Sequence, residues 1–328
     1  MTSTLVLAFG SLLTSTLALR WLARPLVNRA WPAAAVPVLT AGALLNAGLL
    51  LMVAGLLALA VAGRWPVVAA LGEWSPDALA TTFPEPVFVG LGAAAAAVLL
   101  GLRAVWRAGG SIVLLGRSDR LSRRLRSGGA PIVFVDDPTA DAFTVAGVRG
   151  CVVISRSLFA ELDSAERQVL VAHELSHLRR RHHLYIQAVD LAVAANPALT
   201  PLYAAVRLGA ERWADEDAAA ACGVRVRAGR ALARTALVQA SLRRAAGSPA
   251  LTRPPSVLCA TAGGVAARAQ ALMNTPASRR SRPLYLLVAM LLITAVLSLG
   301  SVVQIHDGFE HAELHRAQAA ADIARSPK

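Results

Sequence analysis

Charged residues are scarce in this chain. They make up 16% of its 328 residues, whereas a soluble domain carries about a quarter. Apolar residues account for 55%, and the mean hydropathy is +0.53. These proportions argue against a fully water-soluble enzyme, and the long apolar runs exclude disorder and indicate membrane spans. Lysine is nearly missing as well: Lys328 is the only one, so arginine carries the net charge of +13. That bias indicates no particular function.

Cysteine is also sparse. The three cysteines are Cys151, Cys222 and Cys259, and no two of them have the C-x-x-C spacing of a metal or redox site. Their odd number leaves at least one thiol free, which favours a reduced, cytosol-facing location over a disulfide framework.

Four apolar runs have the length of membrane spans, at about residues 5–22, 35–62, 87–105 and 282–305. No basic residue precedes the first run, which is therefore expected to be a retained anchor rather than a cleaved signal. Asn46 is the one strongly polar side chain of the second run, and we expect it to form a hydrogen bond between helices. The third run has a face of small residues that favours close helix packing; they are Gly90, Gly92, Ala94, Ala97 and Gly101.

Arginine placement predicts the orientation, because short cytoplasmic loops hold the positive excess. Arginines follow the first and third runs and precede the fourth, whereas residues 63–86 have one arginine and three acids. We therefore expect a multi-pass protein of the cell membrane with both termini outside. The arginine-rich stretch 107–126 is expected to lie on anionic lipid headgroups rather than to bind nucleic acid.

Between the third and fourth runs the pattern is β followed by α. Short strands are expected at 131–135, 142–145 and 151–154, the last two forming a hairpin. A helix should begin after Asp163, which has Glu166 at capping-box spacing, and continue to about residue 183. A second should cover about 201–222 and end at Gly223. Helical segments are also expected at about 230–245 and 265–273.

The predicted fold is thus a mostly α membrane protein with four transmembrane helices and a cytoplasmic α+β domain inserted between the third and fourth. The predicted divisions are 1–107 for three spans, 108–281 for the cytoplasmic domain, 282–305 for the fourth span and 306–328 for a short extracytoplasmic tail.

One motif carries chemistry. Residues 173–177 read His-Glu-Leu-Ser-His, an H-E-x-x-H match in a chain with only 7 histidines, where chance predicts roughly one match in a hundred such chains. Residues four apart share a helix face, so His173 and His177 can bind one zinc ion while Glu174 accepts a proton from a zinc-bound water.

A catalytic zinc needs a third protein ligand and an open fourth position. Glu211 on the next predicted helix is the best candidate. Asp215, four residues on, would share its face and could accept the other ring N–H of a ligand histidine. Glu216 and Asp217 are less favoured.

With these residues the sequence resembles the gluzincins, zinc peptidases with two histidines and a glutamate as ligands. The E-x-x-A-D form at residues 211–215 is similar to that of the HtpX and CAAX-prenyl-protease group and of the BlaR/MecR-type membrane peptidases. Residues 141–143 (Asp-Ala-Phe) stand where HtpX-like proteins often have Asn-Ala-Phe, so Asp141 is a departure. Three spans before the motif and one after resemble BlaR/MecR sensors. Residues 304–328 are too few to form their penicillin-binding domain, so β-lactam sensing is not expected.

The resemblance implies a membrane zinc endopeptidase with one Zn²⁺ per chain and Glu174 as the catalytic residue. Its partners would be the lipid bilayer and a protein or peptide substrate. In signal transduction, that substrate would be a transcriptional repressor or the chain itself. No direct nucleic-acid contact is expected, and the sequence does not give the oligomeric state. Peptidases of this kind hold their substrate on a sheet edge, for which the strand at Cys151, Val152, Val153 and Ile154 is the candidate.

Two other functions stay open at this point. One is an HtpX-like protease that degrades damaged membrane proteins; the other is a receptor or scaffold with a structural zinc site, although such a site would have no need of Glu174. A transporter is disfavoured, because the spans lack acidic residues. His182 and His183 follow three arginines and are expected at a solvated or headgroup-facing helix end. His311 and His315 are expected on a solvated helical tail.

Overall fold

The structure, a computed structural model, describes residues 2–126, 129–137, 141–245, 262–274 and 280–325. It is mostly helical, as predicted, with a small sheet. The helices that precede the sheet are α1 (Thr2–Arg29), α2 (Pro32–Ala62), α3 (Pro66–Gly72), α4 (Pro76–Thr82) and α5 (Val87–Leu125). The strands are β1 (Ile132–Val135), β2 (Ala142–Val145) and β3 (Cys151–Ser155). After them come α6 (Arg156–Glu161), α7 (Ser164–Arg179), α8 (His182–Ala195), the 3-10 turn η1 (Pro197–Leu199), α9 (Thr200–Cys222), α10 (Arg225–Ala245), α11 (Ala262–Met273) and α12 (Arg282–Arg325).

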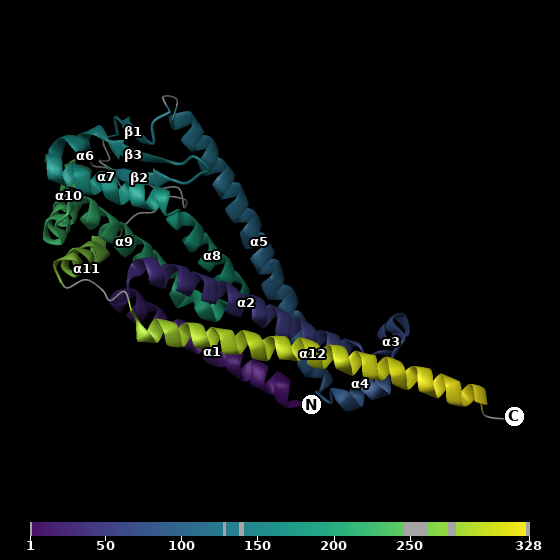
Figure 1. Ribbon diagram of the computed structural model, residues 1–328. Helices are drawn as coiled ribbons and strands as arrows, with labels where there is room; N and C mark the ends of the chain where they lie inside the picture. Colours follow the sequence, from purple (N-terminus) through teal and green to yellow (C-terminus); the bar gives the residue numbers. More distant parts are fainter. Residues whose placement is uncertain (1, 127–128, 138–140, 246–261, 275–279, 326–328) are drawn as a thin grey trace.

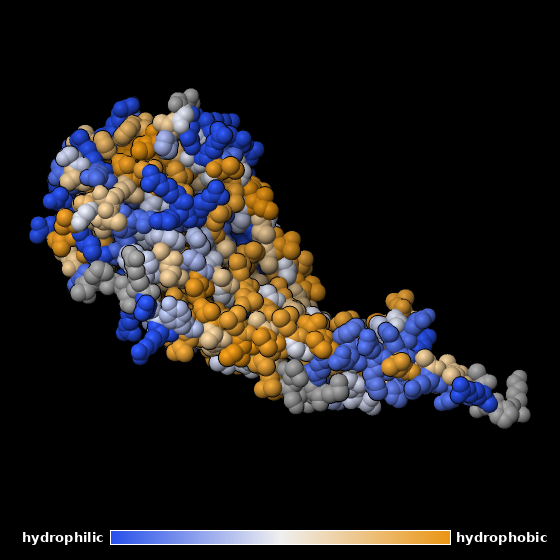
Figure 2. Space-filling model, viewed as in Figure 1, coloured by the Kyte–Doolittle hydropathy of each residue, from blue (hydrophilic) through white to orange (hydrophobic). Residues whose placement is uncertain are grey.

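Four helices are long and apolar enough to cross a membrane: α1, α2, α5 and α12. This confirms the four predicted apolar helices. They lie together in the elongated part of the molecule, whereas the sheet and helices α6, α7, α10 and α11 gather at one end (Figure 1). Figure 2 shows hydrophobic residues across the middle of the visible face and hydrophilic residues toward both ends, as expected of a chain in a bilayer.

Two of these helices extend beyond the predicted spans. Helix α5 has 39 residues and continues without a break through the arginine-rich stretch, which is therefore the far end of a spanning helix and not a separate surface helix. Helix α12 has 44 residues and includes most of the predicted tail. In that tail His311 and His315 are exposed, as expected.

Asn46 forms the predicted hydrogen bonds between helices. Its Oδ1 accepts from Thr16 Oγ1 of α1 at 3.0 Å and from Asn196 Nδ2 at 2.9 Å, while its Nδ2 donates to Ser15 Oγ at 2.8 Å. Asn196 ends α8 and accepts from the Ala198 backbone N–H in η1. A fully buried polar group of α2 thus joins the turn between α8 and α9 to the spanning helices.

The largest core cluster also spans both parts of the molecule. Side chains of α8 and α9 pack in it against α1, α2 and α12, and examples from these five helices are Ile186, Leu202, Leu19, Leu39 and Leu287. Burying these faces stabilises the association by the hydrophobic effect. Because α9 lies in this core, the residues on it are fixed relative to the spans.

The sheet has the strand order β1-β3-β2. Strands β2 and β3 are antiparallel, as the predicted hairpin requires, with Ala142 opposite Ile154, and β1 pairs in parallel with the other side of β3. The predicted position of Cys151, Val152, Val153 and Ile154 at a sheet edge is therefore wrong, because β3 is paired with β1 on one side and with β2 on the other.

Local sequence signals explain where the site helices begin and end. The Asp163 side chain accepts from Glu166 N–H, and Glu166 accepts in return from Asp163 N–H, so the predicted capping box starts α7. Gly223 ends α9 in the left-handed conformation, φ 77°. Helix α7 ends at Arg179, earlier than predicted, and Arg181 at φ 52° separates it from α8.

Candidate metal centre

The two motif histidines face each other on α7. Their Nε2 atoms are 3.1 Å apart, close to the separation of about 3.3 Å expected for two nitrogens bound tetrahedrally at about 2.0–2.1 Å from one zinc ion. Both rings are buried, with His177 only 2% exposed. The i, i+4 spacing on one helix face places them there, as the sequence predicted.

Helix α9 brings Glu211 to the same point. Its Oε2 lies 3.8 Å from His173 Nε2 and its Oε1 lies 3.7 Å from His177 Nε2. His173, His177 and Glu211 each offer one ligand atom, and these three atoms lie within 4.8 Å of one another. In the described part of the chain, this is the group of histidine, cysteine and acidic side chains that could hold a metal ion.

The second nitrogen of each imidazole also has a neighbour. His173 Nδ1 lies 3.1 Å from Asp215 Oδ1, as expected for the partner that orients a ligand histidine. His177 Nδ1 lies 2.9 Å from Nδ1 of His182. These contacts leave both Nε2 atoms directed at the shared point, so the donors present fit a bound zinc ion.

His182 corrects the prediction of a solvated helix end. It is fully buried and His183 is 9% exposed, because the left-handed residue Arg181 turns the chain inward before α8 begins. Burial, with the neighbouring His177, lowers the pKa of His182 to about 2, so this imidazole is neutral at physiological pH. For His177 to bind metal through Nε2, its Nδ1–H must donate, and the neutral ring of His182 can accept.

Sequence reasoning missed Arg268 of α11. Its Nη1 lies 2.7 Å from Glu211 Oε2, and its Nη2 and Nε donate to Asp215 Oδ1 and Oδ2 at 2.6 and 2.8 Å. Although burial opposes ionisation, this guanidinium holds the pKa of Asp215 well below its usual range. Asp215 therefore stays ionised in a buried site, and the same cation contacts Glu211. A single arginine carries no spacing signal, so the sequence could not have identified it.

Glu174 lies beside the ligands and contacts β2. The Thr144 hydroxyl is 2.9 Å from Glu174 Oε2 and 3.0 Å from its backbone oxygen. Burial raises the pKa of the Glu174 carboxyl above its ordinary value, although His173 and the Thr144 hydrogen bond oppose that rise. A raised pKa suits a general base that works near neutral pH.

A cavity of about 140 Å³ adjoins these groups. Helices α10 and α11 line its other side, with Thr235 and Gln239 from α10 and Val265 from α11, and Ala142 of β2 also lines it. Arg243 of α10 forms an ion pair with Asp141 at 2.6 Å at the start of that strand. Asp141, which stands where HtpX-like proteins often have asparagine, therefore has Arg243 as a cationic partner.

The less favoured acids lie elsewhere. Glu216 pairs with Arg225, and Asp217 accepts from Ser176 Oγ at 2.8 Å and from Arg180 Nε at 3.0 Å. Both pairs join α9 to a neighbouring segment and leave Glu211 and Asp215 as the acids of α9 that contact the histidines.

Comparison with known proteins gives one family. The sequence model of peptidase family M48 matches residues 117–279, which include α7, α9, α10 and α11. None of the curated proteins and none of the solved structures matches the chain. Peptidases of family M48 depend on a metal, typically zinc. Residues 117–279 are thus similar to peptidase family M48. This similarity, the buried group of His173, His177 and Glu211, and the four apolar helices support a membrane-associated metallopeptidase.

Proposed function

We propose that this protein is a zinc-dependent endopeptidase in which His173, His177 and Glu211 bind the metal, Asp215 orients His173 and Glu174 is the catalytic base. The observation that carries the proposal is the convergence of two imidazoles and one carboxylate in a buried cavity that also holds a second carboxylate. A structural site would leave Glu174, Thr144 and the adjoining cavity without a role.

A bound zinc ion supplies Lewis acidity, which acidifies a water and polarises the scissile carbonyl. Glu174 takes the proton as the water oxygen bonds to the carbonyl carbon, and it delivers that proton to the amine nitrogen as the C–N bond breaks. The Thr144 hydroxyl holds Glu174 Oε2 in place. Arg268 contacts Glu211, the proposed ligand, and keeps Asp215 ionised beside His173.

The substrate edge belongs to β2 instead of β3. Strand β2 ends the sheet on the side away from β1. On this strand Ala142 lines the metal-site cavity, and the Thr144 hydroxyl contacts Glu174. An extended peptide added to this edge would place its backbone beside the catalytic base.

Residues 117–279 of this endopeptidase would lie in the cytoplasm and cleave a cytosolic or membrane-adjacent protein in signal transduction, by cutting a repressor or the chain itself. Three candidate spans begin before the matched region and one follows it, an arrangement that resembles the BlaR/MecR sensors. The second candidate is HtpX-like quality control of membrane proteins, which the same site chemistry would serve.

The decisive experiment compares purified wild type with Glu174→Gln, measuring bound zinc by elemental analysis and hydrolysis of an unstructured protein. We expect zinc in both and cleavage only by the wild type, because the amide cannot act as a base. Glu161→Gln is the matched control, since this side chain is exposed at the end of α6. Equal cleavage by Glu174→Gln would refute the enzyme, and wild type without zinc would refute the metal site.

Signalling and quality control differ in the number of substrates. In cells with Glu174→Gln, proteins that accumulate uncleaved can be identified by quantitative proteomics. Accumulation of one regulatory protein supports signalling, whereas accumulation of many misfolded membrane proteins supports quality control.

A further inference from the structure

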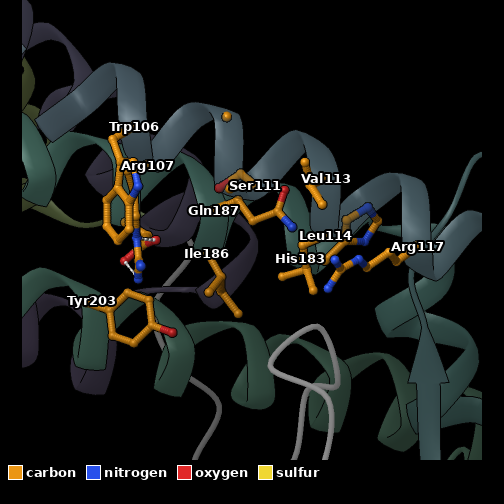
Figure 3. Close-up of a pocket in the computed structure, with 13 residues that line it drawn as sticks. Trp106, Arg107, Ser111, Val113, Leu114, Arg117, His183, Ile186, Gln187 and Tyr203 are labelled. Atoms are coloured by element: carbon orange, nitrogen blue, oxygen red, sulfur yellow. Dashed lines mark hydrogen bonds and ion pairs between the residues drawn. The ribbon is translucent and has the colours of Figure 1, made fainter. Parts of the chain in front are cut away.

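A second cavity, of about 620 Å³, lies between α5 and the pair α8 and α9 (Figure 3). None of its lining residues lines the cavity beside the metal-site residues. Helix α8 separates the two: His182 contacts the ligand His177, whereas the next residue, His183, lines the second cavity. The peptidase chemistry proposed above gives this cavity no role.

The two ends of this cavity differ in character. Trp106, Ile186 and Tyr203 line one end, and Figure 3 shows them beside the ion pair of Arg107 with Asp190. This end is aromatic and apolar, and its one cation is already paired.

Polar groups, with the apolar Val113 and Leu114 beside them, line the rest of the cavity. Arg117 and Ser111 of α5 face His183 and Gln187 of α8 across the cavity (Figure 3). Within the described residues, the side chains of these four make no hydrogen bond or ion pair with protein. Burial lowers the pKa of His183 to about 4, which leaves a neutral imidazole as a hydrogen-bonding group and Arg117 as the cation. Polar groups at a concave surface without protein partners are typical of a ligand site.

The apolar end lies where α5 leaves the membrane. Trp106 directly follows the apolar run 87–105 and is 76% exposed, and Trp21 of α1 is 71% exposed. Arg20 of α1 donates to Ala198 O in η1, and Arg107 of α5 pairs with Asp190 of α8. Exposed tryptophans mark the membrane–water interface. Arg117 is eleven residues beyond Trp106, about 16 Å along the helix.

We propose that this cavity binds one anionic phospholipid, with its phosphate at Arg117, His183, Gln187 and Ser111 and an acyl chain passing Ile186, Tyr203 and Trp106 toward the bilayer. Charge complementarity favours this occupant, because a cation faces the polar end and the apolar end meets the lipid. Phosphate oxygens also accept hydrogen bonds from the guanidinium and amide donors present.

The polar end can be tested by charge removal. The full chain in detergent micelles is titrated with dioleoyl phosphatidylglycerol or dioleoyl phosphatidylcholine, and bound lipids are counted by native mass spectrometry. We expect wild type to prefer phosphatidylglycerol and Arg117→Ala to bind it about fivefold more weakly. Arg120→Ala is the matched control, because this exposed arginine is on the same helix but does not line the cavity.

Occupation of the cavity can be tested by filling it. A Cβ at Gly110, which lines the cavity, or at Gly116, which does not, would meet no heavy atom within 4 Å. A side-chain Cβ therefore has room at both positions. We expect Gly110→Leu to abolish specific phosphatidylglycerol binding and Gly116→Leu to retain it.

Three results would overturn the proposal. Equal weakening by Arg117→Ala and Arg120→Ala would show general surface attraction. Equal binding of the two lipids by wild type would show that charge does not select the occupant. Unchanged lipid binding in Gly110→Leu, together with a raised KM for an unstructured protein substrate, would assign the cavity to a peptide.

Discussion

Arg268 Nη1 lies 2.7 Å from Glu211 Oε2, so a residue of α11 contacts the carboxylate that we propose as the third metal ligand on α9. The same guanidinium donates to both oxygens of Asp215, which in turn lies beside His173. One buried cation therefore positions two acids of the metal centre.

This relationship predicts the effect of Arg268→Gln. Because Glu211 and Asp215 would lose their common cation, zinc affinity should fall about 10- to 100-fold. The free energy of unfolding should fall by about 3–5 kcal/mol, because two buried carboxylates lose their partner. Zinc affinity is measured by competition with a chelator. Arg230→Gln, at an exposed position of α10, is the control and should match wild type. An Arg268→Gln protein that binds zinc as tightly as wild type would contradict the assignment.

His182 should act on metal binding through His177. His182→Ala removes the acceptor 2.9 Å from His177 Nδ1, so zinc affinity should fall by about tenfold. His182→Asn places an oxygen near the former Nδ1 and should recover most of that loss, which a purely structural role would not predict. His183→Ala, which changes the neighbouring residue on the other side of α8, should leave zinc affinity unchanged. The same chelator competition tests all three.

Thr144 should affect catalysis and not metal content. Thr144→Val keeps the shape of the side chain but removes the hydroxyl 2.9 Å from Glu174 Oε2. That hydrogen bond lowers the pKa of Glu174, so its loss raises the pKa, and the base becomes protonated at a higher pH. The acid limb of the kcat/KM profile should therefore shift to higher pH, and kcat should fall by about tenfold, with zinc retained. Loss of zinc in this variant would contradict the assigned role.

On the small-residue face of α5, Gly90 should be required for stability and Gly92 should not. A Cβ at Gly90 would lie 2.3 Å from Val61 Cβ of α2, whereas one at Gly92 would meet nothing within 4 Å. Gly90→Ala should destabilise the protein in detergent by about 1–3 kcal/mol through overpacking, and Gly92→Ala should not. Thermal unfolding of the two variants measures the difference, and an equal melting temperature would show that α2 and α5 do not pack closely there.

Elements set by local spacing were predictable. The H-E-x-x-H spacing puts His173 and His177 on one helix face whatever surrounds them, and the capping residues Asp163 and Glu166 start that helix. The spanning helices follow from the length of their apolar runs. Asn46 could be expected to form hydrogen bonds between helices, since an isolated amide in an apolar span must find a partner.

Other features depend on contacts between segments distant in the chain, which no local pattern encodes. Pairing of β1 with β3 decided that Cys151–Ser155 is the central strand and that β2 is the edge beside Glu174. Packing of α11 against α9 decided that one arginine among many became the partner of Glu211 and Asp215.

The sequence by itself therefore determined the spanning helices and the chemistry of the metal-binding motif, because both are periodic along a single segment. Only the tertiary structure decided which cation contacts Glu211 and Asp215, which strand is the edge beside Glu174, and that His182 faces inward. Those choices depend on burial, which arises when separate helices pack and remove their shared surface from water.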